Sequence, residues 1–324
     1  MNKLRFFNAF FGVLLGLTLL QSCSKGFNVS PLAPNSPNTQ ANLLSAFATI
    51  GTPNYFIDPL GIQYVKGHLW VTNQSCTLQE WTTIGSAPIT TICAYNSGVS
   101  FVNVGRDGID PATGNVYMAD ESDGQIAVYD PTGNYLTVFG NAQMGTTMYL
   151  GYGGPWPIGV AVNSSGTTVY ALDQFSNTIY VYSIGGTATN PTYVYQTSFG
   201  NAGSGPATLN SPSNLRLDSG GNVWVADTGN HRVAEYNGTG TYLKSLKVSG
   251  IDVNFSPVDL LFDGSGSLYS VDNISSVVVK FNLFGTAIGQ FGAGVLNNPQ
   301  GITTDGSGNF FVTNNNPQQI VAFH

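Results

Sequence analysis

The chain has 324 residues, of which 42% are hydrophobic and only 8% charged, and its formal net charge is −7. Soluble α-rich proteins carry roughly 25% charged residues, so this composition, with its 40 Gly, 16 Tyr and 19 Phe, argues against a helical protein and favours an all-β fold. The acidic balance and the lack of a basic stripe exclude nucleic acid as an expected partner.

The N-terminus has the pattern of an export signal. Lys3 and Arg5 precede an apolar run at 6–20, which is shorter than the roughly 20 residues of a transmembrane helix. The run leads into "LQSC" (20–23), which resembles the lipobox of bacterial lipoproteins and implies a lipid on Cys23. The alternative is an ordinary signal peptide with an incidental cysteine.

This pattern predicts a bacterial lipoprotein with three parts. Residues 1–22 form the signal peptide, and residues 23–41, rich in Pro, Asn and Ser, form a flexible tether behind the lipidated cysteine. Residues 42–324 form the folded domain. The expected location is the cell envelope, anchored at the outer membrane.

A repeated motif organises the rest of the chain. The stretch "NVWVADTGNHRVAEY" (222–236) has five degenerate copies, each with a glycine turn, an aromatic strand, an Asp or Asn, a polar turn and an alternating strand. The anchoring aromatics lie roughly 42 to 54 residues apart, the period of a four-stranded propeller blade. They are Trp70, Tyr117, Tyr170, Trp224, Tyr269 and Phe311.

Further strands surround each copy. A shorter inner strand precedes it, and an outer strand ending in glycine follows several copies, as in "YLTVFG" (135–140). The inner strands are predicted at 59–65, 104–110, 157–163, 212–218, 257–263 and 299–305. The sixth unit lacks an outer strand, and 43–51 has the outer-strand pattern but no unit of its own. We therefore expect 43–51 to complete the last blade and close the ring.

The segment at 211–236 resembles an NHL repeat, because Asn230, His231 and Arg232 occupy the place of the Asn-His-Leu triplet that names the family. The resemblance extends over about residues 42–324. It implies a six-bladed β-propeller of four-stranded antiparallel blades, similar to NHL-repeat proteins and streptogramin lyases.

Asp227, His231 and Arg232 could form an acid–base–cation cluster or a polar turn. Asp and Asn bond to neighbouring backbone amides, and Gly229 is expected to supply a positive φ. Asp227 and Arg232 flank the hairpin and are expected to pair or cap it. The turn interpretation is preferred, although only one copy contains all three residues, which leaves the functional one open.

Ligands of six-bladed propellers bind at the mouth of the channel, where the inner strands begin. The third inner-strand position is Gly61, Arg106, Gly159, Asn214, Asp259 or Gly301 in the six units. The three departures from glycine, together with Asp107, predict a polar set at the mouth. It is either an Arg–Asp pair that closes the channel or a polar ligand site.

The long loop 141–157 should cross the face that carries the mouth. Its aromatics Tyr149, Tyr152 and Trp156 lie among glycines, a composition typical of contact surfaces. The alternative is a lid packed on its own propeller. We predict a ligand site made of Arg106, Asp107, Asn214 and Asp259 with these three aromatics.

No catalytic group is predicted. The residues after the inner-strand prolines, or their equivalents, include no carboxylate, so the calcium site of similar lactonases is not reproduced. The chain has only three histidines, and we place His68 and His231 a strand-length from the mouth. The recurring "DGSG" (263–266, 305–308) is interpreted as a hairpin turn. We expect no metal or cofactor.

These features favour a non-enzymatic binding or scaffolding propeller that recognises a protein or glycan. The alternative is a metal-dependent lyase or lactonase of the streptogramin-lyase or gluconolactonase type, so enzymatic activity stays open. A third possibility is a purely structural adhesion protein.

Cys76 and Cys93 are candidates for a disulfide in an oxidising compartment. Both belong to the first unit, Cys76 in a turn and Cys93 in the outer strand. A simple hairpin through 85–88 would place Cys93 opposite Glu80 instead of Cys76, so the sequence does not decide whether the disulfide forms.

Overall fold

The computed structural model describes residues 44–51, 55–74, 77–93, 104–121, 123–144, 154–248, 255–282 and 284–324. The predicted signal peptide (1–22), Cys23, the predicted tether and Cys76 lie outside these residues, as do Tyr149 and Tyr152. Within the described residues, no helix has the length and hydrophobicity needed to cross a membrane.

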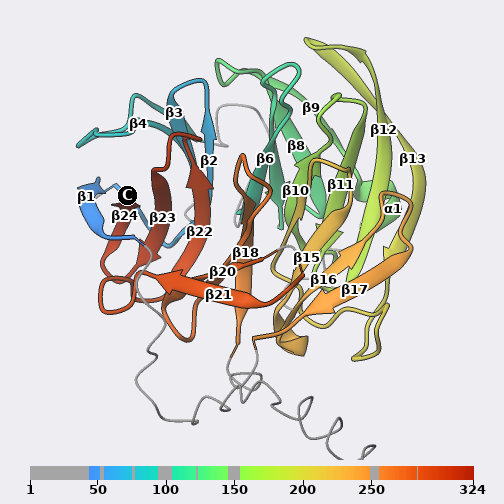
Figure 1. Ribbon diagram of the computed structural model, residues 1–324. Coiled ribbons are helices and arrows are strands. Elements are labelled where there is room, and N and C mark those ends of the chain that lie inside the picture. Colours follow the sequence, from blue (N-terminus) through green and yellow to red (C-terminus); the bar gives the residue numbers. More distant parts are fainter. Residues whose placement is uncertain are drawn as a thin grey trace, which may run out of the picture. The chain divides into compact units, whose positions relative to one another are not determined.

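The described part of the chain is all-β, with six four-stranded antiparallel sheets. Figure 1 shows the inner strands of several sheets near the middle of the ribbon and outer strands such as β1 and β13 at its margins. The fold is a six-bladed β-propeller, as the repeat predicts.

The blades follow one another along the chain, each with its inner strand first. Blade one has β2 (Pro59–Val65), β3 (His68–Asn73), β4 (Thr77–Thr82) and β5 (Thr90–Cys93). Blade two has β6 (Val104–Ile109), β7 (Val116–Asp120), β8 (Gln125–Tyr129) and β9 (Tyr135–Phe139). Blade three has β10 (Pro157–Val162), β11 (Thr168–Asp173), β12 (Thr178–Thr187) and β13 (Asn190–Gly200).

The last three blades have the same order. Blade four has β14 (Asn214–Leu217), β15 (Val223–Asp227), β16 (Arg232–Tyr236) and β17 (Tyr242–Leu246). Blade five has β18 (Pro257–Phe262), β19 (Leu268–Asp272), β20 (Val277–Phe281) and β21 (Ala287–Phe291). Blade six has β22 (Pro299–Thr304), β23 (Phe310–Asn315) and β24 (Gln318–Phe323), with β1 (Ala46–Ile50) as its outer strand.

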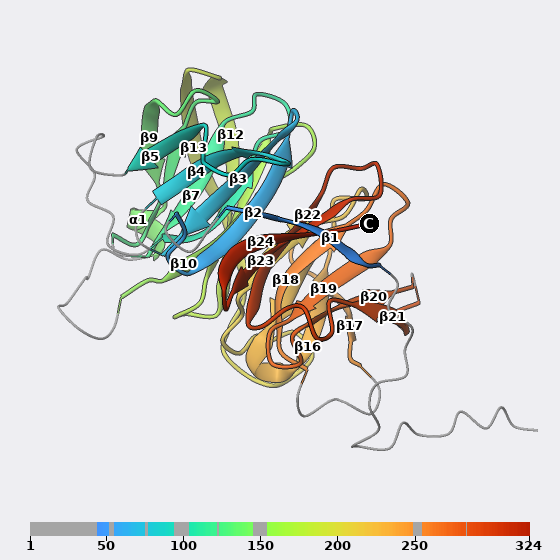
Figure 2. The ribbon, with the colours of Figure 1, turned by 90° about the vertical axis from the view of Figure 1, so that its left-hand side faces the viewer.

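The ring closes through β1, as the sequence predicts. Ile50 lies opposite Ile320 and Thr49 opposite Val321 in the antiparallel β1–β24 pair. Figures 1 and 2 both show the blue β1 beside the red β24, although they come from opposite ends of the domain. Since β1 occupies the outer edge of blade six, β24 is not left as an unpaired edge.

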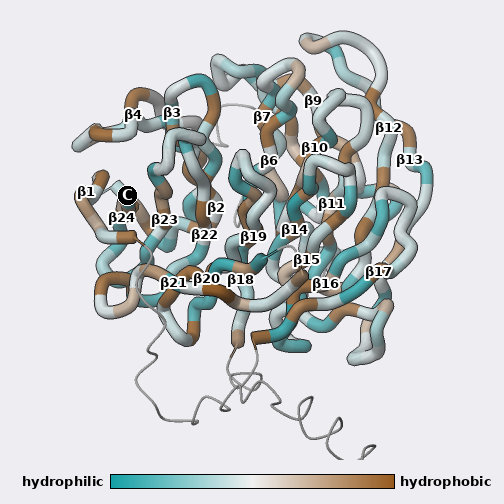
Figure 3. The backbone as a smooth tube through the Cα atoms, viewed as in Figure 1, coloured by the Kyte–Doolittle hydropathy of each residue, from teal (hydrophilic) through white to brown (hydrophobic). Residues whose placement is uncertain are grey.

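The hydrophobic core lies between the blades. Each of six clusters of buried side chains joins two neighbouring blades, and the anchoring aromatics belong to these clusters. In the cluster between blades six and one, Ile50 packs with Ile320, Phe311 and Trp81. Figure 3 shows brown segments concentrated in the strands and teal or pale residues in many turns. Strand alternation therefore gives each blade an apolar side toward each neighbour.

The recurring polar turns are hairpin turns, as predicted for the two "DGSG" sequences. Oδ1 of Asp263 accepts hydrogen bonds from the backbone N–H groups of Ser265 and Ser267, each at 2.9 Å. Asp305 accepts equivalent bonds from Ser307 and Asn309. The carboxylates of these turns are therefore used to satisfy backbone donors.

The register of blade one differs from the simple hairpin expectation. Cys93 pairs with Thr77, and not with Glu80. The connection between β4 and β5 includes residues 85–88 but is not a tight turn through them. Gly85 N donates to Thr82 O at 3.3 Å and Ile89 N donates to Glu80 O at 2.7 Å, and this connection shifts the outer strand by three residues relative to the simple hairpin. Cys93 ends the outer strand, as predicted, beside the residue that follows Cys76.

Candidate functional site

The channel mouth is built by irregular inner strands. In five blades the pairing of the inner strand with the second strand shifts near its start, and in blades two and five the shift directly precedes Asp107 and Asp259. Such bulges redirect side chains. In blades two and five they act on Asp107 and Asp259, whereas Asn214 and Arg216 stand in the regular inner strand of blade four.

The glycines at the third inner-strand position leave room for these polar groups. A Cβ atom on Gly61 would collide with Asp107 Oδ1, and one on Gly159 would lie 2.5 Å from Asn214 Oδ1. The polar residues of blades two and four therefore need glycine in blades one and three. The glycines of one blade and the polar residues of the next therefore complement each other in size around the channel.

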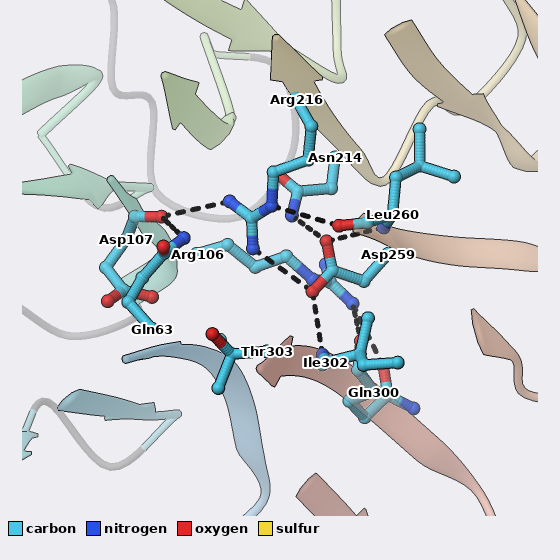
Figure 4. Close-up of polar contacts among 12 residues, drawn as sticks. Gln63, Arg106, Asp107, Asn214, Arg216, Asp259, Leu260, Gln300, Ile302 and Thr303 are labelled. Carbon is cyan, nitrogen blue, oxygen red and sulfur yellow. Dashed lines mark hydrogen bonds and ion pairs between the residues drawn. The ribbon is translucent and has the colours of Figure 1, made fainter. Parts of the chain in front are cut away.

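Asp259 is the best-connected side chain of the predicted set. Its Oδ1 accepts from Asn214 Nδ2 at 2.5 Å and Leu260 N at 2.7 Å, and its Oδ2 accepts from Ile302 N at 3.0 Å. Arg216 adds an ion pair at 3.1 Å. With no exposed surface, Asp259 holds blades four, five and six together (Figure 4).

Arg216 is the central cation that the sequence interpretation missed. Its Nε donates to Leu260 O at 3.2 Å, and its Nη1 donates to Asp107 O at 3.4 Å. The Gln63 amide oxygen, in the orientation that satisfies both groups, accepts from Nη1 at 2.7 Å. A signal was present, since Asn214 and Arg216 alternate with Leu215 and Leu217 in the inner strand.

Arg106 crosses the ring at the mouth. Its guanidinium donates to Ser213 O at 2.9 Å and to Gln300 O at 3.1 Å, so blade two is tied to blades four and six (Figure 4). Burial lowers the pKa of Arg106, while the charge of Asp259 opposes this shift. The Arg–Asp pair considered for the predicted set does not form with Arg106: Asp259 pairs with Arg216, and Arg106 bonds to main-chain carbonyls and to the Gln300 side chain.

Asp107 is the unusual member of the set. It has no exposed surface, and neither carboxylate oxygen has a hydrogen-bond partner within the described residues. Burial raises the pKa of Asp107 to about 7, although Arg216 opposes the shift. Burial also raises the pKa of Glu121, at the end of β7, against the attraction of Arg106. Two carboxyls with raised pKa values, the buried Asp107 and the half-buried Glu121, therefore interact electrostatically with Arg106.

Trp156 lies outside this polar network. Its side chain is 42% exposed, and its ring meets that of Phe175 at 6.1 Å with an interplanar angle of 61°. The pairing of Pro157 with Asp173 places both aromatics at the mouth end of blade three. The structure thus unites Arg106, Asp107, Asn214 and Asp259 in the channel and places Trp156 on the surrounding face.

The Asp227–Arg232 pair serves the turn, as predicted. Arg232 Nε lies 2.7 Å from Asp227 Oδ2, and Asn210 N donates to Asp227 Oδ1 at 2.7 Å. The expected positive φ of Gly229 is wrong: His231 adopts the left-handed conformation, with φ of 54°. A Cβ on Gly229 would contact Asn210, which explains the glycine by space instead.

The histidines do not approach the channel network. His68 begins β3 at the end opposite the mouth, as expected, and its side chain pairs with Glu80. His231 differs from its predicted place, because the pairing of Asn214 with Ala226 puts its turn at the mouth end. Its Nδ1 bonds to Phe255 O at 2.8 Å, joining blade four to the approach of blade five. Across the described residues, no three potential metal-ligating His, Cys, Asp or Glu side chains gather.

This fold and this polar channel define the chain as a six-bladed β-propeller with its central channel crossed by arginines. A family model described as the SMP-30/gluconolactonase/LRE-like region matches residues 156–258. The Protein brain tumor of Drosophila melanogaster is 22% identical over 134 residues, which cover 40% of this chain but only 13% of that protein.

Two solved structures have similar folds. A catalytically inactive virginiamycin B lyase from Staphylococcus aureus with quinupristin gives a TM-score of 0.55 at 17% identity, covering 86% of this chain and 83% of the other. A nidogen/laminin complex gives 0.53 at 17% identity, covering 72% and 79%. These comparisons confirm the resemblance to NHL-type and streptogramin-lyase-like propellers at the level of fold.

Proposed function

We propose that this protein is a non-enzymatic binding propeller, held at the bacterial cell envelope by a lipid on Cys23, whose mouth-end face recognises a protein or glycan. The main support is the Trp156–Phe175 pair, which is exposed on the face around the channel mouth. The arginines of the channel itself already have hydrogen-bond or ion-pair partners inside the propeller. The lipid anchor rests on the lipobox-like sequence.

The aromatic pair is exposed but held in place by its backbone. Trp156 N donates to Asp173 Oδ1 at 2.7 Å, and Gln174 N donates to Trp156 O at 2.9 Å. Phe175 N also donates to Asp173 Oδ1, at 3.1 Å. Aromatic rings on a fixed backbone lose little conformational entropy on binding, which supports their use as contact residues.

Further apolar side chains lie at the same end of other blades. Tyr55 and Ile57 precede β2, Ile274 lies in the β19–β20 turn and Val295 precedes β22, and all four are exposed. Apolar groups spread over several blades suit a broad partner surface better than a small enclosed ligand. The similar fold in a nidogen/laminin complex supports the same interpretation by analogy.

The test is a screen of the full-length chain against glycans, peptidoglycan fragments and envelope proteins, with and without chelator. Trp156→Ala should weaken binding by about 1–3 kcal/mol without changing thermal unfolding. Phe284→Ala is the matched control, since Phe284 is 92% exposed at the opposite end of blade five. Equal affinity of the wild type and Trp156→Ala for every ligand found would place recognition elsewhere.

One observation favours the alternative, a lyase or lactonase. Asp107 is a buried carboxyl with a pKa raised to about 7 and no partner among the described residues. Such a group can accept or donate a proton near neutral pH. Turnover of a lactone that is lost in Asp107→Asn and on chelation would establish this activity in place of the binding role.

A further inference from the structure

A separate groove lies between blades four and five, toward the end opposite the channel mouth. Its volume is about 420 Å³, in the range of small-ligand sites. Both blades contribute to its lining: Trp224, Glu235 and Lys244 come from blade four, and Phe262 and Asp263 from blade five. It shares no residue with the channel network or with the Trp156–Phe175 pair.

The floor of the groove is aromatic. Trp224 is almost fully buried, and its ring meets Phe262 at 5.4 Å with an interplanar angle of 65°. Lys244 Nζ lies 5.3 Å from the centroid of the Trp224 ring. Cations within about 6 Å of a ring centroid are attracted to the aromatic face. The chain's own lysine shows that the groove accommodates an alkylammonium group.

The charges of the groove are unbalanced. Three carboxylates line it, Asp218, Glu235 and Asp263, against the single cation of Lys244. Burial alone would raise the pKa of Asp218, but hydrogen bonds from Trp224 and the turn residues outweigh it and hold the pKa below its ordinary value. Hydrogen bonds from the residues of its own turn likewise hold the pKa of Asp263 below its ordinary value. Both are ionised at neutral pH, so the groove keeps a negative excess.

Lys244 is a replaceable occupant. Its Nζ lies 3.4 Å from Glu235 Oε2, and 44% of its side chain is exposed to solvent. Partly exposed single ion pairs of this kind contribute little to stability. A ligand ammonium could therefore take the place over Trp224 while Lys244 turns toward solvent.

The neighbouring gap between blades five and six has a different composition. Lys280 lies 5.1 Å from the Tyr269 ring, but Phe310 packs against the same ring at 4.8 Å. The third-strand position that holds Glu235 opposite Trp224 holds Lys280 opposite Tyr269. Aromatic floor, carboxylate excess and open volume thus come together in the groove of blades four and five.

From these contacts we infer that the groove between blades four and five binds an alkylammonium group, either a lysine side chain of a partner or a free amine. The ammonium lies over Trp224 beside Glu235, and its alkyl chain lies along Phe262; Asp263, whose carboxylate is held by its own turn and by the Tyr269 hydroxyl, contributes negative charge to the lining.

Calorimetry on the full-length chain tests this with three probes: the peptide acetyl-Gly-Ser-Lys-Ser-Gly-amide, the same peptide with Nε-acetyllysine, and 1,5-diaminopentane. The lysine peptide should bind, and acetylation should weaken it at least about tenfold, because the charge is lost. Tighter binding of the diamine would identify a free amine as the source, and tighter binding of the peptide a partner's lysine.

Variants localise the site. Glu235→Gln should lower the affinity for the tighter-binding probe about tenfold. Lys244→Met should raise that affinity, because the substitution removes the ammonium group that competes for the place over Trp224. Glu80→Gln is the matched control: Glu80 faces Trp70 in blade one as Glu235 faces Trp224, but it pairs with His68. If Glu235→Gln fails to fold, Asp263→Asn replaces it, since Asn163 supports the equivalent turn between the first two strands of blade three.

The inference fails if neither cationic probe binds the wild type or Lys244→Met, or if the acetylated peptide binds equally well. It also fails if Glu80→Gln weakens binding as much as Glu235→Gln. None of these outcomes depends on a ligand at the mouth-end face, so the two proposals are tested separately.

Discussion

The side chains of Arg216 and Asp259 join blades four and five in a buried ion pair, with Nη2 3.1 Å from Oδ2. Arg216 also reaches the carbonyl of Asp107 in blade two, so one side chain contacts opposite sides of the ring. The channel network therefore contributes to ring closure, and the stability of the propeller should depend on it.

Asp259→Ala should lower the free energy of unfolding by about 3–5 kcal/mol, because it leaves Arg216 buried without its counter-ion. Urea unfolding of the full-length chain measures the change. The control is Asp123→Ala, at an exposed turn of blade two, which should change it by less than about 1 kcal/mol. A small effect of Asp259→Ala would mean that water replaces the carboxylate.

Removal of β1 should prevent stable ring closure. A truncation that begins at residue 53 deletes the partner of β24 and the buried Ile50, so an edge and part of a core cluster become exposed. We expect aggregation in size-exclusion chromatography. A monomeric truncation that melts at the wild-type temperature would contradict the role of β1.

Asp107 should make stability depend on pH. Because burial raises its folded pKa to about 7, the folded protein binds a proton between about pH 4 and 7 that the unfolded chain has released. The contribution of Asp107 to the free energy of unfolding is therefore fully present below about pH 4 and is lost as the pH rises through 7.

Asp107→Asn should remove this loss and raise stability at pH 8 by up to about 4 kcal/mol relative to the wild type, with little gain at pH 4. Urea unfolding at both values measures the difference, which cancels the contributions of other buried carboxyls such as Asp272. An equal effect of the substitution at both pH values would show that Asp107 does not titrate in this range.

Cys23→Ser should release the protein from the membrane fraction, because it removes the proposed site of lipidation. Fractionation followed by mass spectrometry of the N-terminus measures this, and Cys93→Ser, far from the lipobox-like sequence, is the control. Retention of an unprocessed Cys23→Ser variant in the membrane would indicate that residues 6–20 act as an anchor.

Thiol counting under denaturing conditions tests the Cys76–Cys93 bond. Cys93 lies opposite Thr77, the residue that follows Cys76 in the sequence, and not opposite Glu80. A bond would close a loop of roughly 16–18 residues and contribute about 3 kcal/mol. Two free thiols in addition to Cys23 would exclude it.

The number and order of the blades could be predicted from the sequence because they depend on local patterns. Alternation defines the strands, glycine and Asp or Asn define the turns, and the copies confirm one another. Even the role of β1 follows from counting, since the sixth unit supplies only β22, β23 and β24 and the segment before the first unit has the outer-strand pattern. Arg106, Asp107, Asn214 and Asp259 were found together because they stand near the same point of successive inner strands.

Their partners depended on the tertiary structure. Whether Asp259 pairs with Arg106 or with Arg216 is decided by the geometry of the closed ring, where residues from separate blades meet. The left-handed conformation of His231 and the register of Cys93 likewise depend on contacts with Phe255 and on the turn at Gly85. Periodicity specifies which face a side chain occupies, but only packing across the channel specifies which charge it meets.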